Sequence, residues 1–216
     1  MELLIEFVKA TPEYQGWGWN LVSFSFLATV AFTFFLQLPG LTNQSRTIWL
    51  NHSAKGVEML TFIAFFTYFI VFFVYAVSIH SGAGVVNVLA LIVPQLFILA
   101  GIARFKQMRT IDKLAALVGA VIFVLALVLP QKEIFFSIVS VGVFVGLLLQ
   151  PLEMIRTKTS ENIALSFPAN FTIVTAVWTI YALAIGDWFL AVASAAFTLE
   201  YLLVVILWFV YRPQKT

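Results

Sequence analysis

The sequence contains no cysteine and few charged residues. Of its 216 residues, 10% are Asp, Glu, Lys or Arg, and 62% are hydrophobic. Because about 25% of the residues in a soluble domain are charged, this chain has too few to cover a surface that faces water. The lack of cysteine excludes disulfides and thiol chemistry and leaves the redox compartment open. The net charge of +2 gives no reason to expect a nucleic-acid partner.

Apolar runs of bilayer length recur through the chain, with short polar breaks between them. We predict seven spans, at residues 17–38, 57–79, 85–103, 114–129, 134–149, 166–185 and 188–211. Residues 1–16 are acidic and their apolar pattern is broken, so we expect an interfacial helix or a loose tail there and not a secretory signal. The predicted fold class is all-α, a multi-pass integral membrane protein surrounded by the lipid bilayer.

The sequence contains an internal duplication. The second copy reads Gln150-Pro151, a basic Ser/Thr turn, and then Trp178-Thr179-Ile180-Tyr181; the first reads Gln37-Leu38-Pro39, a longer basic turn, and then Phe72-Phe73-Val74-Tyr75. The prolines lie 112 positions apart (151 minus 39) and the tyrosines 106 (181 minus 75). We therefore expect the first turn to be six residues longer than the second.

The duplication divides the chain into five parts. They are an extracytoplasmic segment (1–16), a first three-helix repeat (17–103), a basic loop with a linker helix (104–131), a second three-helix repeat (132–211) and a cytoplasmic tail (212–216). A single linker helix lets both repeats keep the same orientation in the membrane. Parallel repeats of this kind occur in transporters, with the solute site at the repeat interface near the bilayer midplane.

Positive charges predict the orientation. Ten of the twelve Lys and Arg residues lie in the loops after the first, third and fifth spans or in the tail: Arg46, Lys55, Arg104, Lys106, Arg109, Lys113, Arg156, Lys158, Arg212 and Lys215. The opposite side has Lys9 and Lys132. The positive-inside rule therefore predicts that the N-terminus lies outside and the C-terminus lies in the cytoplasm.

The second copy resembles the PQ-loop superfamily, because it combines Gln-Pro at 150–151, a basic Ser/Thr turn, Trp-x-x-Tyr at 178–181 and Gly-Asp at 186–187. The three-one-three order of spans is similar to that of the SWEET sugar transporters. This resemblance covers about residues 17–211. It implies a uniporter that moves a sugar or a similar small uncharged polar solute by alternating access, and it leaves homo-oligomers open.

The resemblance also implies a pocket lined by the Trp of each repeat and by an Asn about sixteen residues later. Trp178 is followed at that distance by Ser194, and Phe72 is followed within one residue of it by Asn87. Each repeat thus keeps one member of the pair. The two amides expected to bind sugar hydroxyls have become one amide and one hydroxyl.

Three prolines match places where the resemblance implies that helices bend: Pro39, Pro151 and Pro168, with Phe62 at the fourth place. As hinges, they would let each repeat rock. Proline also ends helices, because it lacks an N–H group and clashes one turn back, and it is common at helix starts. Terminators at the first two positions and a helix start at the third stay open as alternatives.

Polar side chains within apolar spans usually face inward and mark a pathway. In the seventh span Ser194 shares a stripe with polar neighbours, and in the sixth Asn170 and Tyr181 share one beside Trp178. Aromatic walls with a few amides and hydroxyls suit a neutral polar solute. The candidate substrate-binding residues are Asn87, Trp178, Ser194, Phe72, Asn170, Tyr75 and Tyr181. For Ser194, close helix packing is the alternative.

Glu200 is the one acidic residue well inside a predicted span. A charged carboxylate at mid-membrane costs about 2.5–3.5 kcal/mol on insertion scales, so something should compensate it. At 100° per residue, Glu200 lies about 120° from the stripe of Ser194. We therefore expect it to face a helix contact or a side crevice, in a structural role. The alternative is a proton-coupled carrier of amino acids or other small solutes, with Glu200 as the proton site.

We expect no enzymatic activity, no cofactor and no metal site. The sequence has no His-Cys cluster, no glycine-rich phosphate loop and no nucleophile–base pair, and its two histidines, His52 and His80, are predicted on opposite sides. A seven-helix cargo or ligand receptor of the same fold is the second alternative. Such a receptor would need buried basic residues facing a cavity, whereas most basic residues here are in loops.

Overall fold

The structure, a computed structural model, describes residues 2–54, 57–160 and 163–212. Within these ranges the chain forms helices joined by short loops. The helices are α1 (Glu2–Ala10), α2 (Pro12–Gln15), α3 (Leu21–Phe32), the π-helical turn η1 (Thr33–Gln37), α4 (Leu38–Leu50), α5 (Met59–Ser78), α6 (Gly82–Phe105), α7 (Thr110–Val128), α8 (Lys132–Leu147), α9 (Leu149–Thr157), α10 (Ser166–Ala184) and α11 (Trp188–Tyr211). Lys55, Lys215 and the predicted tail beyond Arg212 lie outside the described residues.

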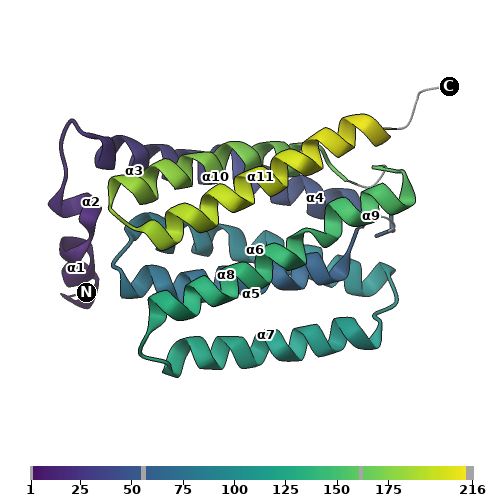
Figure 1. Cartoon of the computed structure of the whole chain (residues 1–216), viewed down its shortest axis with the longest axis horizontal. Helices are drawn as coiled ribbons and strands as arrows, with labels where there is room; N and C mark the ends of the chain where they lie inside the picture. The colour runs from purple at the N-terminus through teal and green to yellow at the C-terminus, as the bar shows by residue number, and fades with distance from the viewer. Residues whose placement is uncertain (1, 55–56, 161–162, 213–216) are drawn as a thin grey trace.

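The described residues contain seven helical spans long and apolar enough to cross a membrane, which confirms the predicted fold class. The first span is continuous from α3 through η1 to α4, and the fifth joins α8 to α9. The first helix, α1, and the last turn of α11 lie at opposite ends of the bundle (Figure 1). We call these the N-terminal end and the C-terminal end.

The prolines at 39 and 151 do not end their helices, so the prediction that these spans stop near 38 and 149 is wrong. Pro39 is the second residue of α4, directly after η1, and Pro151 is the third residue of α9. In the first turn of a helical segment the missing proline N–H leaves no bond unmade, so the helix continues. Pro168, the third residue of α10, likewise stands at a helix start.

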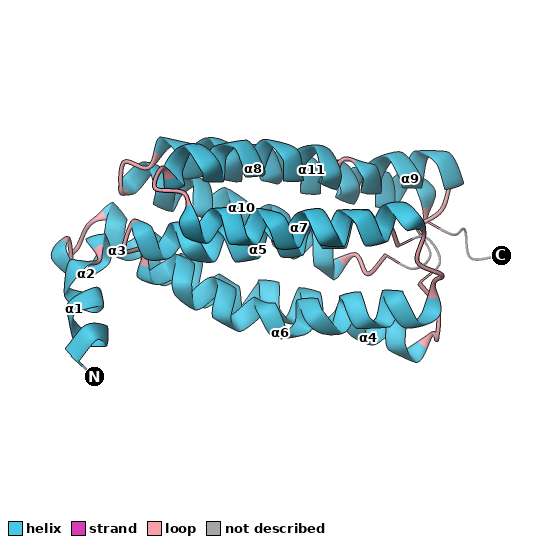
Figure 2. Ribbon diagram, turned by 90° about the horizontal axis from the view of Figure 1, so that it is seen from below, coloured by secondary structure: helices cyan, strands magenta, loops and turns pink. Residues whose placement is uncertain are grey.

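Each repeat places its third helix between the other two. In the first repeat α6 packs against α4 and α5, and in the second repeat α11 packs against α8 and α10. The repeats meet where α5 packs on α8 and where α10 packs on α3 and η1. The bundle therefore has several layers of roughly aligned helices (Figure 2).

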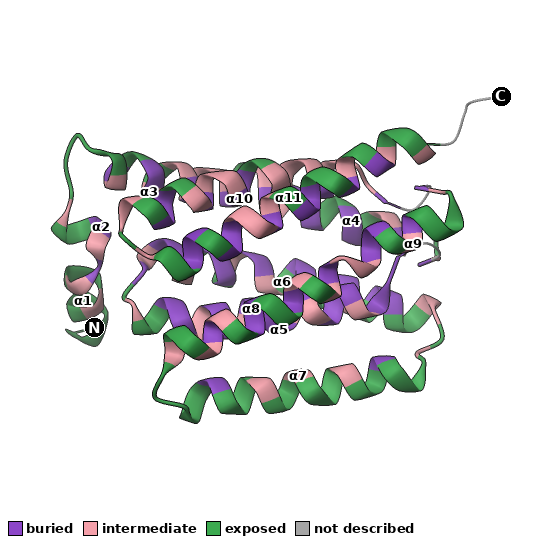
Figure 3. Ribbon diagram, viewed as in Figure 1, coloured by how far each residue is buried: buried purple, intermediate pink, exposed green. Residues whose placement is uncertain are grey.

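The linker helix α7 lies at the edge of the bundle and is largely exposed (Figure 3). It packs mainly along α5. Gly119 permits the close approach, because a Cβ atom there would lie 2.6 Å from Thr67 Oγ1. The outward side chains of α7 include exposed Leu and Val residues, as expected for a helix that faces hydrocarbon.

Aromatic side chains fill the space between the repeats. Phe72 of α5 meets Trp178 of α10 edge-on, with ring centroids 5.4 Å apart. Tyr68 of α5 meets Phe197 of α11 in the same way at 4.9 Å. Edge-on pairs of this kind stabilise a contact beyond the area they bury, so the repeat interface is well packed in this conformation.

Candidate functional site

A small cavity, here the central cavity, lies between the repeats. It has a volume of about 30 Å³, space for about two water molecules. Its walls come from η1, α5, α6, α10 and α11: Gln37, Phe65, Tyr68, Phe69, Phe72, Asn87, Phe171, Thr175, Trp178, Leu190, Ser194, Phe197 and Tyr201. The lining combines aromatic rings with amides and hydroxyls, and none of the described residues in it is Asp, Glu, Lys or Arg.

Asn87 enters the central cavity from α6 and is held by the π-helical turn. Its Nδ2 atom donates to Thr33 Oγ1 at 2.8 Å and to Gln37 Oε1 at 2.5 Å. All three residues are buried, so these bonds satisfy polar groups that water does not reach. Sequence reasoning missed Thr33 and Gln37, although the Gln beside a Leu-Pro pair in an apolar span was a signal.

Four of the seven predicted solute-binding residues line the central cavity: Phe72, Asn87, Trp178 and Ser194. The Thr198 hydroxyl on α11 lies within hydrogen-bond distance of Thr175 Oγ1 on α10, at 3.0 Å, and of the Ser194 carbonyl, at 2.8 Å. This bond joins the two helices beside Trp178. The cavity wall of the second repeat is thus held in place by hydroxyl groups.

The other three predicted residues serve contacts around the cavity. Asn170 donates from Nδ2 to the carbonyl of Leu36 in η1 at 2.8 Å, so it joins α10 to the first span. Tyr75 and Tyr181 point towards the N-terminal end. Helical periodicity placed these side chains on inward faces, but it could not show which neighbour their polar atoms reach.

Two tyrosines close the N-terminal end by reaching from one repeat to the other. Tyr75 of the first repeat donates to Asp187 Oδ2 at 2.7 Å, and the Tyr181 hydroxyl of the second lies 2.9 Å from Ser81 Oγ. Ser81 and Asp187 are the N-caps of α6 and α11. Both the tyrosines and the caps are 106 positions apart (181 minus 75, 187 minus 81). We call these two bonds the tyrosine closure.

Glu13 of α2 adds to the tyrosine closure from the N-terminal segment. Its Oε1 atom accepts from the Tyr181 hydroxyl at 2.5 Å and from the Ala83 backbone N–H at 3.1 Å. Glu13 is buried. Of the two expectations for residues 1–16, helix or loose tail, the structure shows helices fastened to the bundle by this carboxylate.

Two glutamines join the repeats at the C-terminal end. Gln44 Oε1 accepts from the Ala164 N–H at 3.2 Å, and Gln150 Oε1 accepts from the Glu58 N–H at 3.5 Å. The separation is again 106 positions (150 minus 44, 164 minus 58). We call these bonds the glutamine closure.

The constant separation corrects the predicted alignment of the repeats. The expectation that the first turn is six residues longer is wrong, because 106 positions separate equivalent contacts at both ends. By this separation Pro151 corresponds to Ser45 and not to Pro39. Gln37-Leu38-Pro39 and Gln150-Pro151 look alike in sequence, but their glutamines make different contacts. Gln37 binds Asn87, whereas Gln150 belongs to the glutamine closure.

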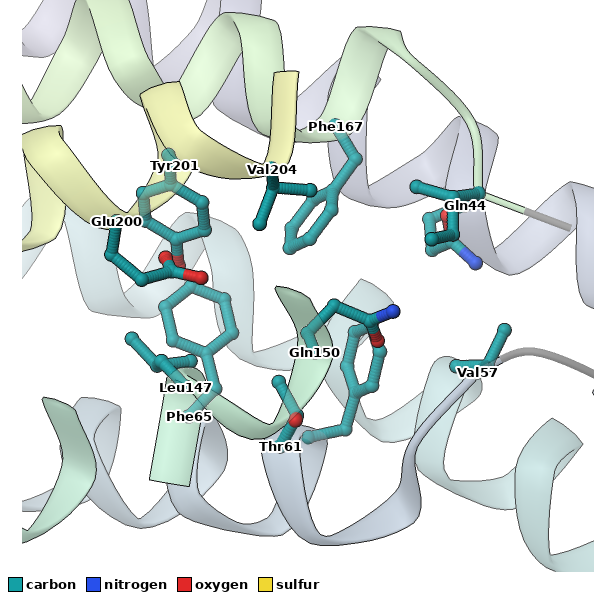
Figure 4. Close-up of a pocket in the computed structure, with 12 residues that line it drawn as sticks. Gln44, Val57, Thr61, Phe65, Leu147, Gln150, Phe167, Glu200, Tyr201 and Val204 are labelled. Carbon is teal, nitrogen blue, oxygen red and sulfur yellow. The ribbon is translucent and has the colours of Figure 1, made fainter. Parts of the chain in front are cut away.

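A second cavity, the glutamate cavity, lies on the C-terminal side of the central cavity and shares the walls Phe65 and Tyr201 with it. It has a volume of about 20 Å³. Its lining residues are Gln44, Val57, Thr61, Phe62, Phe65, Leu147, Gln150, Ile163, Phe167, Glu200, Tyr201 and Val204. Figure 4 shows the carboxyl group of Glu200 turned into this space.

Glu200 lines the glutamate cavity and is not part of the central-cavity lining that contains Ser194. Its position is therefore a side crevice away from the stripe of Ser194, one of the two positions expected from the helical wheel. Its Oε2 atom is buried and has no hydrogen-bond partner among the described residues.

Charged side chains gather beyond the glutamine closure. Glu58 pairs with Lys106 at 3.5 Å and with Arg109, and Arg109 also binds Asp112 at 2.8 Å. Hydrogen bonds to Asp112 and to Glu58 hold the pKa of Arg109 above its ordinary value. Part of the predicted basic loop is thus paired at the C-terminal end. Among the described residues, no group of three or more His, Asp or Glu side chains could hold a metal ion.

Comparisons with known proteins bear on the fold. Neither the protein-family models nor the curated proteins include a match to this chain. A search of solved structures finds a eukaryotic SWEET transporter, with a TM-score of 0.58 and 16% sequence identity, over 88% of this chain and 96% of that chain. This chain has a SWEET-like fold. At such low identity, the likeness concerns the arrangement of the helices.

Proposed function

We propose that this chain is a membrane transporter that moves a sugar or a similar small uncharged polar solute by alternating access, as a uniporter. The lining of the central cavity supports this proposal. It offers the amide of Asn87 and the hydroxyls of Ser194 and Thr175 between the rings of Trp178 and Phe72, and the described part of the lining has no charged side chain. Such a surface binds hydroxyl groups and apolar sugar faces without selecting an ion. The solved structure with this fold is also a transporter.

The observation that carries the proposal is the pair of closures at opposite ends of the cavities. The tyrosine closure and the glutamine closure each join one repeat to the other. Breaking one while keeping the other would give access from one side only, which is the alternating-access cycle. The central cavity must also widen, because about 30 Å³ is too small for a sugar.

In this proposal the repeats 17–103 and 132–211 are the moving units, and 104–131 is the linker. Pro39, Pro151 and Pro168 act as hinges, since each stands in the first turn of a helical segment, where the first N–H groups have no partner within the helix and fewer bonds hold the chain. The split of positive charges places the N-terminus outside and the C-terminus in the cytoplasm. The tyrosine closure then faces the outside.

Uptake into proteoliposomes tests the proposal, with a panel of sugars and amino acids, with and without a proton gradient. We expect uptake of at least one uncharged polar solute. Asn87→Ala and Trp178→Ala should reduce it about 5- to 150-fold, since a lost hydrogen bond to a buried partner costs about 1–3 kcal/mol.

Two variants of the same residue types serve as controls. Asn43 is exposed and Trp19 is 95% exposed, so Asn43→Ala and Trp19→Ala should transport like the wild type. Wild-type uptake in both folded cavity variants would place the solute site elsewhere. Uptake of no solute in the panel would contradict the proposed function itself.

Of the alternatives, a cargo or ligand receptor is the less favoured. Neither cavity has a Lys or Arg among the described residues that line it, and such a receptor would use basic side chains to hold acidic cargo. A role for protons is favoured by a specific observation, the position of Glu200 in the glutamate cavity. That observation leads to the inference below.

A further inference from the structure

We propose that Glu200 is a proton-binding site that must be protonated for the C-terminal end of the transporter to close. The inference deepens the proposed function, on which it rests for the meaning of closure in the transport cycle. The ligand is a proton, taken from the solution at the C-terminal end. In the step, a carboxylate and a proton give a neutral carboxylic acid, and the reverse step returns the proton to the same solution.

The position of Glu200 carries the proposal. The residue is 3% exposed, and its Oε2 atom has no hydrogen-bond partner among the described residues. The carboxyl group points into the glutamate cavity (Figure 4), whose volume of about 20 Å³ leaves room for about one water molecule. A carboxylate needs several hydrogen bonds or a cation when it leaves water, and no described residue supplies either to the Oε2 atom.

Within residues 2–54, 57–160 and 163–212, no Lys or Arg side chain lines the glutamate cavity. The helices packed against α11 are α8, α9 and α10, and α4 and α5 complete the cavity wall with Gln44 and Phe65. Tyr201 is the other titratable residue of the lining. The charged or titratable residues of these elements are Arg46, Tyr68, Tyr75, Lys132, Glu133, Glu153, Arg156 and Tyr181, and none of the charged ones lines the cavity. The closed cavity therefore holds the protonated acid.

Opening of the glutamine closure changes this balance. Gln44 and Gln150 line the glutamate cavity and also make the closure, through their bonds to the Ala164 and Glu58 N–H groups. Breaking these bonds and moving the repeats apart admits water to Glu200. A hydrated carboxyl group ionises readily at neutral pH. Ionisation then favours the open form and protonation favours the closed form, since a ligand shifts an equilibrium towards the state that binds it better.

A labelling experiment tests this linkage without knowledge of the solute. The natural chain has no cysteine, so Val204→Cys places one thiol in the wall of the glutamate cavity. A membrane-impermeant thiol reagent is added at the C-terminal end over a range of pH values. The labelling rate of Val204→Cys at each pH is divided by the labelling rate of Leu152→Cys, an exposed site on α9. This ratio corrects for ionisation of the thiol, which changes both rates.

We expect this ratio to rise with pH in the wild-type background, by up to about tenfold per pH unit, the limit for a single titrating group. Glu200→Gln keeps the shape of the protonated acid and should hold the ratio low and constant. Glu133→Gln, an exposed acid at the start of α8, should behave like the wild type. A purely structural Glu200 would not give a pH-dependent ratio.

The inference is overturned if the wild-type ratio does not change with pH, or if Glu200→Gln keeps the wild-type change. If Glu200→Gln does not fold, the pH dependence of the labelling ratio of Val204→Cys to Leu152→Cys in the wild-type background still tests the inference. Failure of solute uptake would contradict the proposed function, whereas a flat labelling ratio with normal uptake would contradict this inference alone. The two failures are therefore distinguishable.

Discussion

The two ends of the bundle are closed by different chemistry. At the N-terminal end, side chains meet side chains: Tyr75 binds Asp187 at 2.7 Å, and Tyr181 lies 2.9 Å from Ser81 and also binds Glu13. At the C-terminal end, two glutamine carbonyls accept backbone N–H groups at 3.2 and 3.5 Å. Both closures follow the same repeat symmetry.

This difference teaches which end should open more readily. A hydrogen bond to a carboxylate contributes about 1.5–3 kcal/mol, and one between neutral groups contributes about 0.5–1.5 kcal/mol. The tyrosine closure contains the carboxylate of Asp187, and the added bond from Tyr181 reaches the carboxylate of Glu13. The bonds of the glutamine closure are between neutral groups and are longer. We therefore expect the C-terminal end to open at lower free-energy cost. The protonation of Glu200 would then set how often it does so.

The largest effect is expected from Tyr75→Phe, which removes the hydroxyl bound to Asp187. The loss of about 1.5–3 kcal/mol corresponds to about 10- to 150-fold in the opening equilibrium. A thiol placed in the central cavity by Ser194→Cys should be labelled faster by that factor from the N-terminal end. Tyr211→Phe is the control, since it removes a hydroxyl bound to Lys158 at the other end. Equal labelling in both variants would contradict the role of the tyrosine closure.

A smaller effect is expected from Gln44→Leu, which removes the bond to the Ala164 N–H. For this neutral bond we expect Val204→Cys to be labelled about 2- to 10-fold faster from the C-terminal end. Gln95→Leu is the matched control, because Gln95 is equally buried but donates to the Phe62 carbonyl within the first repeat. If Gln44→Leu increased labelling at the C-terminal end more than Tyr75→Phe increases it at the N-terminal end, the glutamine closure would be the stronger of the two closures.

The orientation of the two ends can be assigned without disturbing the cavities. A reporter fused after Thr216 should report the cytoplasm, and one fused before Met1 should report the outside, because ten of the twelve basic residues belong to loops predicted on the same side as the C-terminus or to the tail itself. Transport should remain at the wild-type level in both fusions. A C-terminal reporter found outside would overturn the proposed orientation and assign the tyrosine closure to the cytoplasmic face.

Local sequence patterns predicted the spans well and the helix ends poorly. Long apolar runs can be satisfied in a bilayer only by helices, so all seven spans could be predicted. The ends at Pro39 and Pro151 were misplaced, because proline ends a helix in its interior and starts one in its first turn. Whether a proline ends or starts a helix depends on the turn before the proline. The turn before Pro39 is η1, a π-helical turn that no sequence pattern predicted.

The candidate site was predicted in part for a similar reason. Phe72, Asn87, Trp178 and Ser194 lie on inward faces and line the central cavity. Periodicity gives the face of a helix, but it does not give the partner of a polar atom. It therefore could not show that Tyr75 reaches Asp187, 112 positions away.

The sequence by itself determined the membrane environment, the number of spans and the presence of two repeats, because these follow from composition and from the order of residues along the chain. The tertiary structure alone decided the repeat separation of 106 positions, the two closures and the cavity that holds Glu200. These features depend on which side chains from distant segments meet in the folded bundle. A buried carboxyl group becomes a proton site only where its neighbours provide neither a cation nor enough water, and those neighbours are brought together by the fold.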